Sequence, residues 1–220
     1  MVRFENVSKV YDGQQALSGV SFEAGRGEML FITGASGAGK STLLKLIYHA
    51  ISADEGEITV NGAAIGGMKG RHVSGLRRQI GVVFQDFRLL SEKNIYDNVA
   101  LAMRIRGVSE RALKAQVMET LKTVGLRHKA DSFPETLSGG EQQRAVIARA
   151  VVAEPLLLLA DEPTGNLDPE TSAGIMRIFK DINARGATVI IATHNKDLYE
   201  GSGRRVLRLA SGKIDREDVG

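Results

Sequence analysis

Gly34-Ala35-Ser36-Gly37-Ala38-Gly39-Lys40-Ser41 directly follows a short apolar run at residues 29–33, and this order predicts a strand, a loop and a helix. The glycines let backbone N–H groups turn inward around phosphate oxygens, where a Cβ would obstruct the approach. A helix that begins at Ser41 adds the positive end of its dipole. We expect Lys40 to contact the β- and γ-phosphates of a nucleotide and the Ser41 hydroxyl to bind Mg²⁺. A glycine-rich turn without a ligand is the alternative, which the preceding strand disfavours.

Further apolar runs end in a polar residue in the same way. They are continuous rather than alternating, which is typical of parallel strands covered on both faces. The runs lie at residues 80–84, 156–160 and 188–193, and they lead into Gln85, Asp161-Glu162 and His194. Ligands of open parallel sheets bind beyond the carboxyl ends of the strands. We therefore expect these polar groups to converge with the glycine loop at one edge of a sheet.

Asp161 and Glu162 are adjacent carboxylates at the end of a leucine-rich run. Neighbouring side chains at a strand end point to opposite sides, so the two carboxylates are free to have different functions. We expect Asp161 to hold Mg²⁺ through water and Glu162 to polarise a water that attacks the terminal phosphate. The alternative is an exposed acidic turn before Pro163, which leaves the position of the leucine-rich run unexplained.

The composition favours one α/β domain. The chain has 220 residues, of which 43% are hydrophobic, and its net charge of +3 comes from interspersed acids and bases. This balance demands neither nucleic acid nor an anionic membrane as a partner. There are no cysteines, which excludes disulfides and thiolate zinc sites. No apolar segment predicts an export signal or a membrane span, so we expect a cytoplasmic location and any membrane association to be indirect.

Leu137-Ser138-Gly139-Gly140-Glu141, which runs into Gln142-Gln143-Arg144, resembles the signature motif of the ATP-binding cassette (ABC) family. The resemblance implies that this motif contacts the nucleotide held by a second copy of the domain. It therefore implies a homodimer that forms around ATP. The stretch Gly165-Asn166-Leu167-Asp168 matches the family's D-loop, which crosses the dimer seam. Contacts to the partner's ATP are accordingly expected from Ser138, Gly139, Gly140 and Asp168.

The resemblance also implies site residues. Tyr11 matches the aromatic residue that stacks on adenine, although on its own it is more simply interpreted as a strand aromatic. Gln85 matches a ligand of Mg²⁺ and water, and His194 matches the histidine that contacts the γ-phosphate. The expected catalytic residues are Lys40, Gln85, Glu162 and His194. The expected Mg²⁺ ligands are Ser41, Gln85 and Asp161, and the expected ATP-binding residues are Tyr11, Gly34, Ala35, Ser36, Gly37, Ala38, Gly39, Lys40, Ser41 and Thr42.

The fold class implied is an α/β P-loop NTPase of the ABC nucleotide-binding type, with a mainly parallel core sheet, an antiparallel β flap and a helical lobe. We expect a single domain over residues 1–220. The core and flap would occupy about residues 1–85 and 155–220, and the lobe about residues 86–154. Flap strands are expected at residues 2–11, 20–23 and 56–61, a helix at 138–152, and a closing hairpin at 206–214.

The run from Asp161 to Asp168 is similar to the branch of the family that contains lipoprotein-release, macrolide-efflux and cell-division cassettes. Residues 84–90 and 95–99 look most like the cell-division members. This resemblance implies an ATPase that drives an integral-membrane partner of the FtsX type and regulates cell-wall hydrolysis from the cytoplasmic face of the inner membrane. The alternatives are the ATPase subunit of a lipoprotein-release or macrolide-efflux transporter, and a soluble ATP-gated clamp without a membrane partner.

The apolar residues Phe87, Leu89 and Leu90 follow Gln85. The resemblance implies that this boundary forms a groove for a short helix of the membrane partner. The alternative is that these side chains fill the core of the helical lobe itself.

Overall fold

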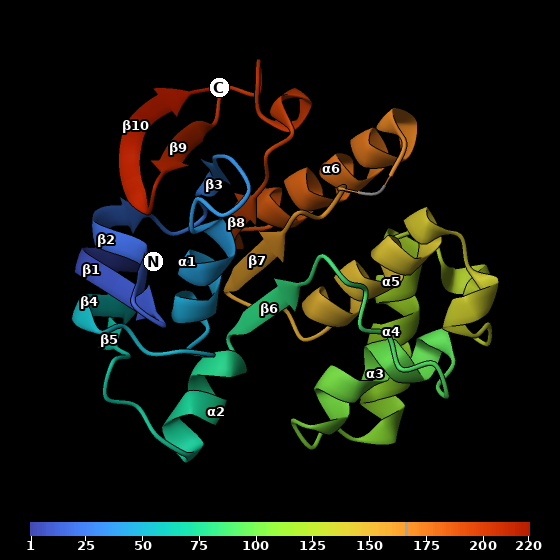
Figure 1. Cartoon of the computed structure of the whole chain (residues 1–220). Coiled ribbons are helices and arrows are strands. Elements are labelled where there is room, and N and C mark those ends of the chain that lie inside the picture. Colours follow the sequence, from blue (N-terminus) through green and yellow to red (C-terminus); the bar gives the residue numbers. More distant parts are fainter. Residues whose placement is uncertain (166) are drawn as a thin grey trace.

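In the computed structural model, which describes residues 1–165 and 167–220, helix α1 (Lys40–Ile47) lies between two β-sheets (Figure 1). The smaller sheet is antiparallel and has the order β2-β1-β4-β5. Its strands are β1 (Val2–Tyr11), β2 (Gln14–Ala24), β4 (Glu55–Val60) and β5 (Ala63–Ala64). This sheet is the expected flap, although its second strand begins well before residue 20.

The larger sheet has the order β10-β9-β3-β8-β7-β6 and is parallel except at β10. Its strands are β3 (Met29–Thr33), β6 (Ile80–Val83), β7 (Leu157–Asp161), β8 (Thr188–Ala192), β9 (Arg205–Ala210) and β10 (Lys213–Val219). The four apolar runs of the sequence are thus adjacent parallel strands, and the α/β fold class is confirmed.

The parallel pairing of β9 with β3 is the part of this sheet that the sequence did not predict. The closing hairpin forms around Ser211-Gly212 as expected, but β9 also pairs in parallel with β3, from Leu30–Arg205 to Thr33–Arg208. A hairpin pattern specifies the partner of one edge of each strand only. The neighbour at the other edge is chosen by tertiary contacts.

The continuous apolar character of the parallel strands is explained by burial on both faces. Leu30 and Ile32 of β3 join the core that contains α1 and the flap, whereas Met29 and Phe31 join a second core on the opposite face. That second face is covered by α5 (Gly139–Val151) and α6 (Pro169–Ala184). Successive strand residues point to opposite faces, so neither face can be polar.

A third core lies among α3 (Ile95–Arg104), α4 (Glu110–Thr123) and α5, at the lower right of Figure 1. Helix α5 belongs to two cores, because Val146 and Ile147 pack toward the sheet while Ala145 and Ala148 pack among the helices. Arg71–Arg77 forms the short helix α2, and the described ranges also contain short 3₁₀ turns. Within residues 1–165 and 167–220, no helix is long and apolar enough to cross a membrane.

Candidate functional site

The glycine loop connects β3 to α1 and lines a cavity of about 420 Å³. Its glycines are required by the chain's own contacts as well as by a ligand. A Cβ on Gly34 would lie 2.2 Å from the carbonyl oxygen of Leu209, and a Cβ on Gly39 would lie 2.6 Å from that of Ala16. Gly39 also has a φ of 107°, a conformation that favours glycine. Strands β9 and β2 therefore hold the loop tightly from both sides.

The cavity brings together most of the residues that the sequence singled out. Its lining comes from the glycine loop, from the start of α1 and from the ends of neighbouring strands. The lining residues are Ala16, Ala35, Ser36, Gly37, Gly39, Lys40, Ser41, Thr42, Gln85, Glu162 and His194. The sequence did not single out Ala16, which reaches the cavity because β2 passes beside the loop.

Lys40 is almost fully buried at the first position of α1. Its Nζ donates hydrogen bonds to the carbonyl oxygens of Gly34, at 2.8 Å, and Ala35, at 3.1 Å. It also lies 3.7 Å from Glu162 Oε1. The ammonium group is thus desolvated but surrounded by oxygen atoms, and it is held at the mouth of the loop.

Glu162 is held by residues at the end of the neighbouring strand β8. Its carboxylate accepts hydrogen bonds from Thr193 Oγ1 and from the backbone N–H of His194, both at 3.1 Å, and its Oε1 lies 2.8 Å from His194 Nδ1. Glu162 has a φ of 46°, which costs a residue with a Cβ about 1–2 kcal/mol. The left-handed turn aims the carboxylate across the strand ends rather than into solvent. Thr193, fully buried, was not predicted as a site residue; its place directly before His194 was the only signal.

Asp161 has a different environment from its neighbour. Its Oδ1 is buried and has no hydrogen-bond partner among the described residues. Burial raises the pKa of Asp161, and Glu162 adds to this effect, while the Ser41 hydroxyl and the nearby lysines oppose it. A desolvated carboxylate oxygen beside a hydroxyl, without a protein donor, fits a hard cation such as Mg²⁺. The residues present therefore suit the metal that the sequence implied.

Tyr11 and the residues expected to contact the partner's ATP do not line this cavity. Tyr11 is the last residue of β1 and does not line the cavity; the ammonium of Lys9 lies 5.5 Å from its ring centroid. Ser138 caps α5 in a reciprocal pair with Glu141, and Asp168 caps α6 by accepting from the N–H of Thr171 at 2.9 Å. Gly139 and Gly140 form the first turn of α5. Asn166 lies outside the described residues.

Gly140 has an explanation within the chain. A Cβ at this position would lie 2.5 Å from Cγ2 of Thr171, so the missing side chain lets α5 approach α6 closely. The two helix starts that carry Ser138 and Asp168 are therefore fixed beside each other. Both residues are exposed and do not line the chain's own cavity.

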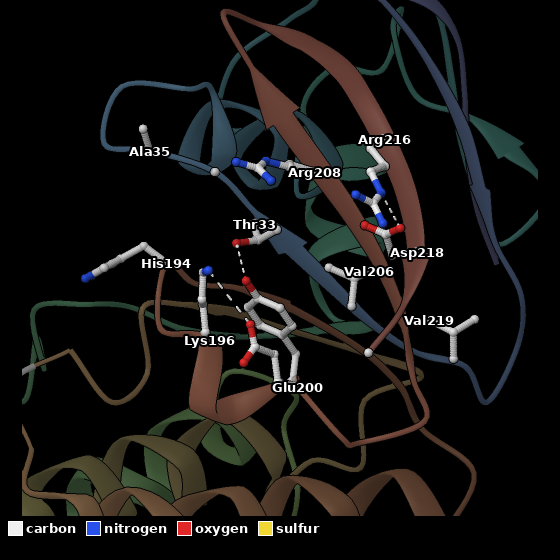
Figure 2. A pocket seen from close by; sticks show the side chains of 13 residues that line it. Thr33, Ala35, His194, Lys196, Glu200, Val206, Arg208, Arg216, Asp218 and Val219 are labelled. Carbon is white, nitrogen blue, oxygen red and sulfur yellow. Dashed lines mark hydrogen bonds and ion pairs between the residues drawn. The ribbon is translucent and has the colours of Figure 1, made fainter.

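A second cavity, of about 430 Å³, adjoins the glycine loop and shares Ala35 and His194 with the first (Figure 2). Many of the charged side chains around it pair with one another, as Lys196 does with Glu200 at 3.9 Å and Arg216 with Asp218. Tyr199 reaches Thr33, the last residue of β3, with 3.5 Å between the hydroxyl oxygens. The Tyr199 contact joins the segment after β8 to the end of β3, at the base of the glycine loop.

A phosphate loop at the carboxyl edge of a parallel sheet, facing two carboxylates from a nearby strand, defines a P-loop nucleotide-binding domain. A family model described as "ABC transporter" matches residues 17–165, and the chain belongs to this ATP-binding cassette family. It is accordingly an ABC-type ATPase.

The chain is similar to curated proteins over nearly its whole length. It is 52% identical to the cell division ATP-binding protein FtsE of Escherichia coli K12, over 97% of each chain. It is 46% identical to FtsE of Streptococcus pneumoniae D39, over 99% of this chain and 95% of that one. Among solved structures, the dimeric post-hydrolysis state of the ATP-binding cassette MJ0796 bound to ADP and Pi superposes with a TM-score of 0.92 at 34% identity, covering 100% of this chain and 98% of that one.

Replacing Asp161 with Asn should raise the melting temperature of the protein when no nucleotide or metal is added. A raised carboxyl pKa means that the folded state binds more protons than the unfolded state between the two pKa values, so stability falls as pH rises through that window. The amide removes this penalty, so its advantage should be largest at neutral pH and shrink as the pH falls toward about 4. Thermal unfolding from about pH 5 to 8, beside the exposed control Asp86→Asn, measures it. An Asp161→Asn protein less stable than the parent at neutral pH contradicts this account.

Proposed function

We propose that this chain is the ATP-hydrolysing subunit of a bacterial cell-division complex. The observation that carries the proposal is the sequence identity to FtsE proteins, 52% and 46% over nearly the full length of the chain. The strand ends of the same chain form the site described above. The proposal treats residues 1–220 as one cassette domain with a helical lobe at about residues 86–154. A location on the cytoplasmic face of the inner membrane, through a partner, belongs to the same proposal.

ATP would bind in the cavity of the glycine loop. Lys40 is a buried cation in this cavity. Its ammonium would exchange its hydrogen bonds to the loop carbonyls for hydrogen bonds to the phosphate oxygens. Ser41, Gln85 and Asp161 would hold Mg²⁺, which supplies charge neutralisation for the phosphates when bound. Tyr11 has an exposed ring at the end of β1, and stacking on adenine would require that ring to move toward the cavity.

Glu162 would act as the general base. Its carboxylate is oriented by Thr193 and His194 from the neighbouring strand, and it already lies 3.7 Å from Lys40 Nζ. When the Lys40 ammonium binds phosphate oxygens instead of Glu162, the carboxylate would be available to accept a proton from water beside the terminal phosphate. His194 Nδ1 then remains close to Oε1 of Glu162, so the imidazole would position the carboxylate relative to the terminal phosphate.

The variant Glu162→Gln should keep ATP binding and reduce the hydrolysis rate by about 10²–10⁴-fold, because the amide cannot accept the proton. Fluorescent-nucleotide titration and a phosphate-release assay measure the two properties separately. Glu200→Gln, which makes the same change at an exposed position, is the matched control. The base would have to be reassigned if hydrolysis by the Glu162→Gln protein stayed within a few-fold of the parent.

We further propose that the ATP-bound chain is a homodimer in which the starts of α5 and α6 contact the partner's nucleotide. Ser138, Gly139, Gly140 and Asp168 lie outside the chain's own cavity, yet they form two adjacent helix N-termini, a favourable environment for an anion. A dimeric cassette is also present among the structural relatives.

A mixing experiment tests this arrangement. Lys40→Ala damages the loop that binds ATP, and Ser138→Arg damages the surface offered to the partner's ATP. A heterodimer of the two variants would carry both lesions in one composite site and leave the other site whole. ATPase activity should therefore return on mixing, to at most about half of the parent value, although neither variant is active alone. Absence of recovery in demonstrated heterodimers would exclude action in trans.

The partner proposed is an integral-membrane protein resembling FtsX. Phe87 is half-buried against the core between the sheet, α5 and α6, and Leu89 packs against that core and against the core of the helical lobe, whereas Leu90 is exposed. Leu101, in the last turn of α3, and Ile105, the residue that caps the C-terminus of this helix, are both exposed, Ile105 by 65%. An apolar helix face of this kind suits a partner contact. A lipoprotein-release or macrolide-efflux transporter would use the same surface, whereas a soluble clamp would not.

Ile105→Asp should release the protein from membranes while leaving ATP affinity unchanged, because α3 does not line the nucleotide cavity. The matched control is Val219→Asp, which changes a residue that is 77% exposed on β10. Membrane fractionation and cell length in a bacterium that depends on this protein are the readouts. Release with filamentous cells supports the division partner, and release with normal cell length favours a transporter. Equal membrane binding of both variants and the parent would reject this contact face.

A further inference from the structure

The segment that carries Gln85 is attached to the helical layer at its far end. Asn98 of α3 is fully buried; its amide donates to the carbonyl oxygen of Leu90 at 3.0 Å and accepts from the Leu90 N–H at 2.7 Å. At its near end the segment leaves β6, which ends at Val83 in the core sheet. Residues 84–90 thus connect the sheet to the helices, and Gln85 lies at the sheet side of this connection.

Arg149 holds the middle of the same segment. It lies in the last turn of α5, and its two Nη groups donate to the carbonyl oxygens of Phe87, at 3.0 Å, and Arg88. Burial lowers the pKa of Arg149, and the charge of Arg88 adds to the effect. The guanidinium of Arg149 is thus partly desolvated, and its hydrogen bonds to the two backbone carbonyls offset part of that cost.

Phe87 connects this contact to the other end of α5. A Cβ on Gly139, in the first turn of the helix, would lie 4.0 Å from Cζ of Phe87. The ring of Phe87 therefore lies near the start of α5, while its carbonyl is held by Arg149 near the end. Phe87 is thus close to α5 near both ends of the helix.

A separate contact attaches the segment to the sheet side. The guanidinium of Arg88 lies 4.2 Å from the ring centroid of Phe84, and that ring packs edge-on against Tyr48 after α1. Arg88 has a φ of 50°, in the left-handed region, so the backbone turns sharply at this residue. The side chain faces the core elements and the carbonyl faces α5.

We propose that Arg149 is a positioning residue for Gln85, because it holds the backbone of residues 87–88, directly beyond Gln85 and Asp86, against α5. Without these two contacts the segment would shift, and Gln85 would shift with it at the edge of the nucleotide cavity. The inference rests on the proposed function, in which Gln85 binds Mg²⁺ and the start of α5 contacts the partner's ATP.

A double-mutant cycle in the full chain tests the coupling. Arg149→Met removes both carbonyl contacts, and it should lower kcat by about 5–50-fold while the Kd for ATP changes by less than about 3-fold. If Arg149 acts through Gln85, the double variant Arg149→Met/Gln85→Ala should turn over within about 2-fold of Gln85→Ala alone. If Arg149 has a merely structural role, the fold losses in kcat of the two single variants should multiply in the double variant.

Arg106→Met is the matched control. Arg106 also donates to two backbone carbonyls between the helices and the core, those of Ala153 and Arg78, but these lie outside the Gln85 segment. Its effect on kcat should multiply with that of Gln85→Ala. If Arg149→Met does not fold, Arg149→Lys keeps the charge with a single donor group, and the same cycle is measured with it.

The outcomes separate this inference from the proposed function. Multiplying losses for Arg149 and Gln85, or an unchanged kcat in a folded Arg149→Met protein, overturn the coupling and leave the ATPase function standing. So does a Gln85→Ala protein with normal kcat when Glu162→Gln is inactive. Absence of hydrolysis by the parent chain would instead overturn the proposed function, and the coupling with it.

Discussion

The parallel register of the core sheet is the constraint on which the site depends. Val83 pairs with Ala160, Asp161 pairs with Ala192, and Ala192 also lies opposite Ile32 of β3. The four strands therefore end at nearly the same level, and the segments that follow them bring Gln85, Glu162 and His194 to one cavity with the glycine loop. A shift of one residue in any pairing would move the following polar group by about 3.3 Å and turn its side chain to the other face.

Helix α5 connects the core sheet to the layer of helices. Because one face packs on the sheet and the other among α3 and α4, the helix cannot move without disturbing two cores. Its first turn carries the Ser138 motif and its last turn carries Arg149, so a surface offered to a second molecule and a support of the Gln85 segment belong to one rigid element. The close approach to α6 at Gly140 adds the Asp168 turn to the same body.

The site combines buried charges whose partners differ in kind. The Lys40 ammonium is surrounded by backbone carbonyls and Glu162, and the Glu162 carboxylate by Thr193 and His194, so both are compensated within the chain. Asp161 instead keeps a buried oxygen without a donor among the described residues. Burying a carboxylate in this way raises its pKa and destabilises the folded chain at neutral pH, a cost that a bound cation would remove.

The sequence by itself determined the elements and the chemistry at their ends. The glycine loop, Asp161-Glu162 and His194 could be located because each follows a continuous apolar run, a pattern that depends only on local composition and burial. Only the tertiary structure decided that β9 lies beside β3, that Thr193 orients Glu162, and that Arg149 reaches the Phe87 and Arg88 carbonyls, 62 and 61 residues away along the chain. It also placed Tyr11 away from the cavity and Ala16 beside the loop. These contacts join distant segments through backbone carbonyls, strand edges and single hydroxyl groups, which leave no periodic or compositional trace in the sequence.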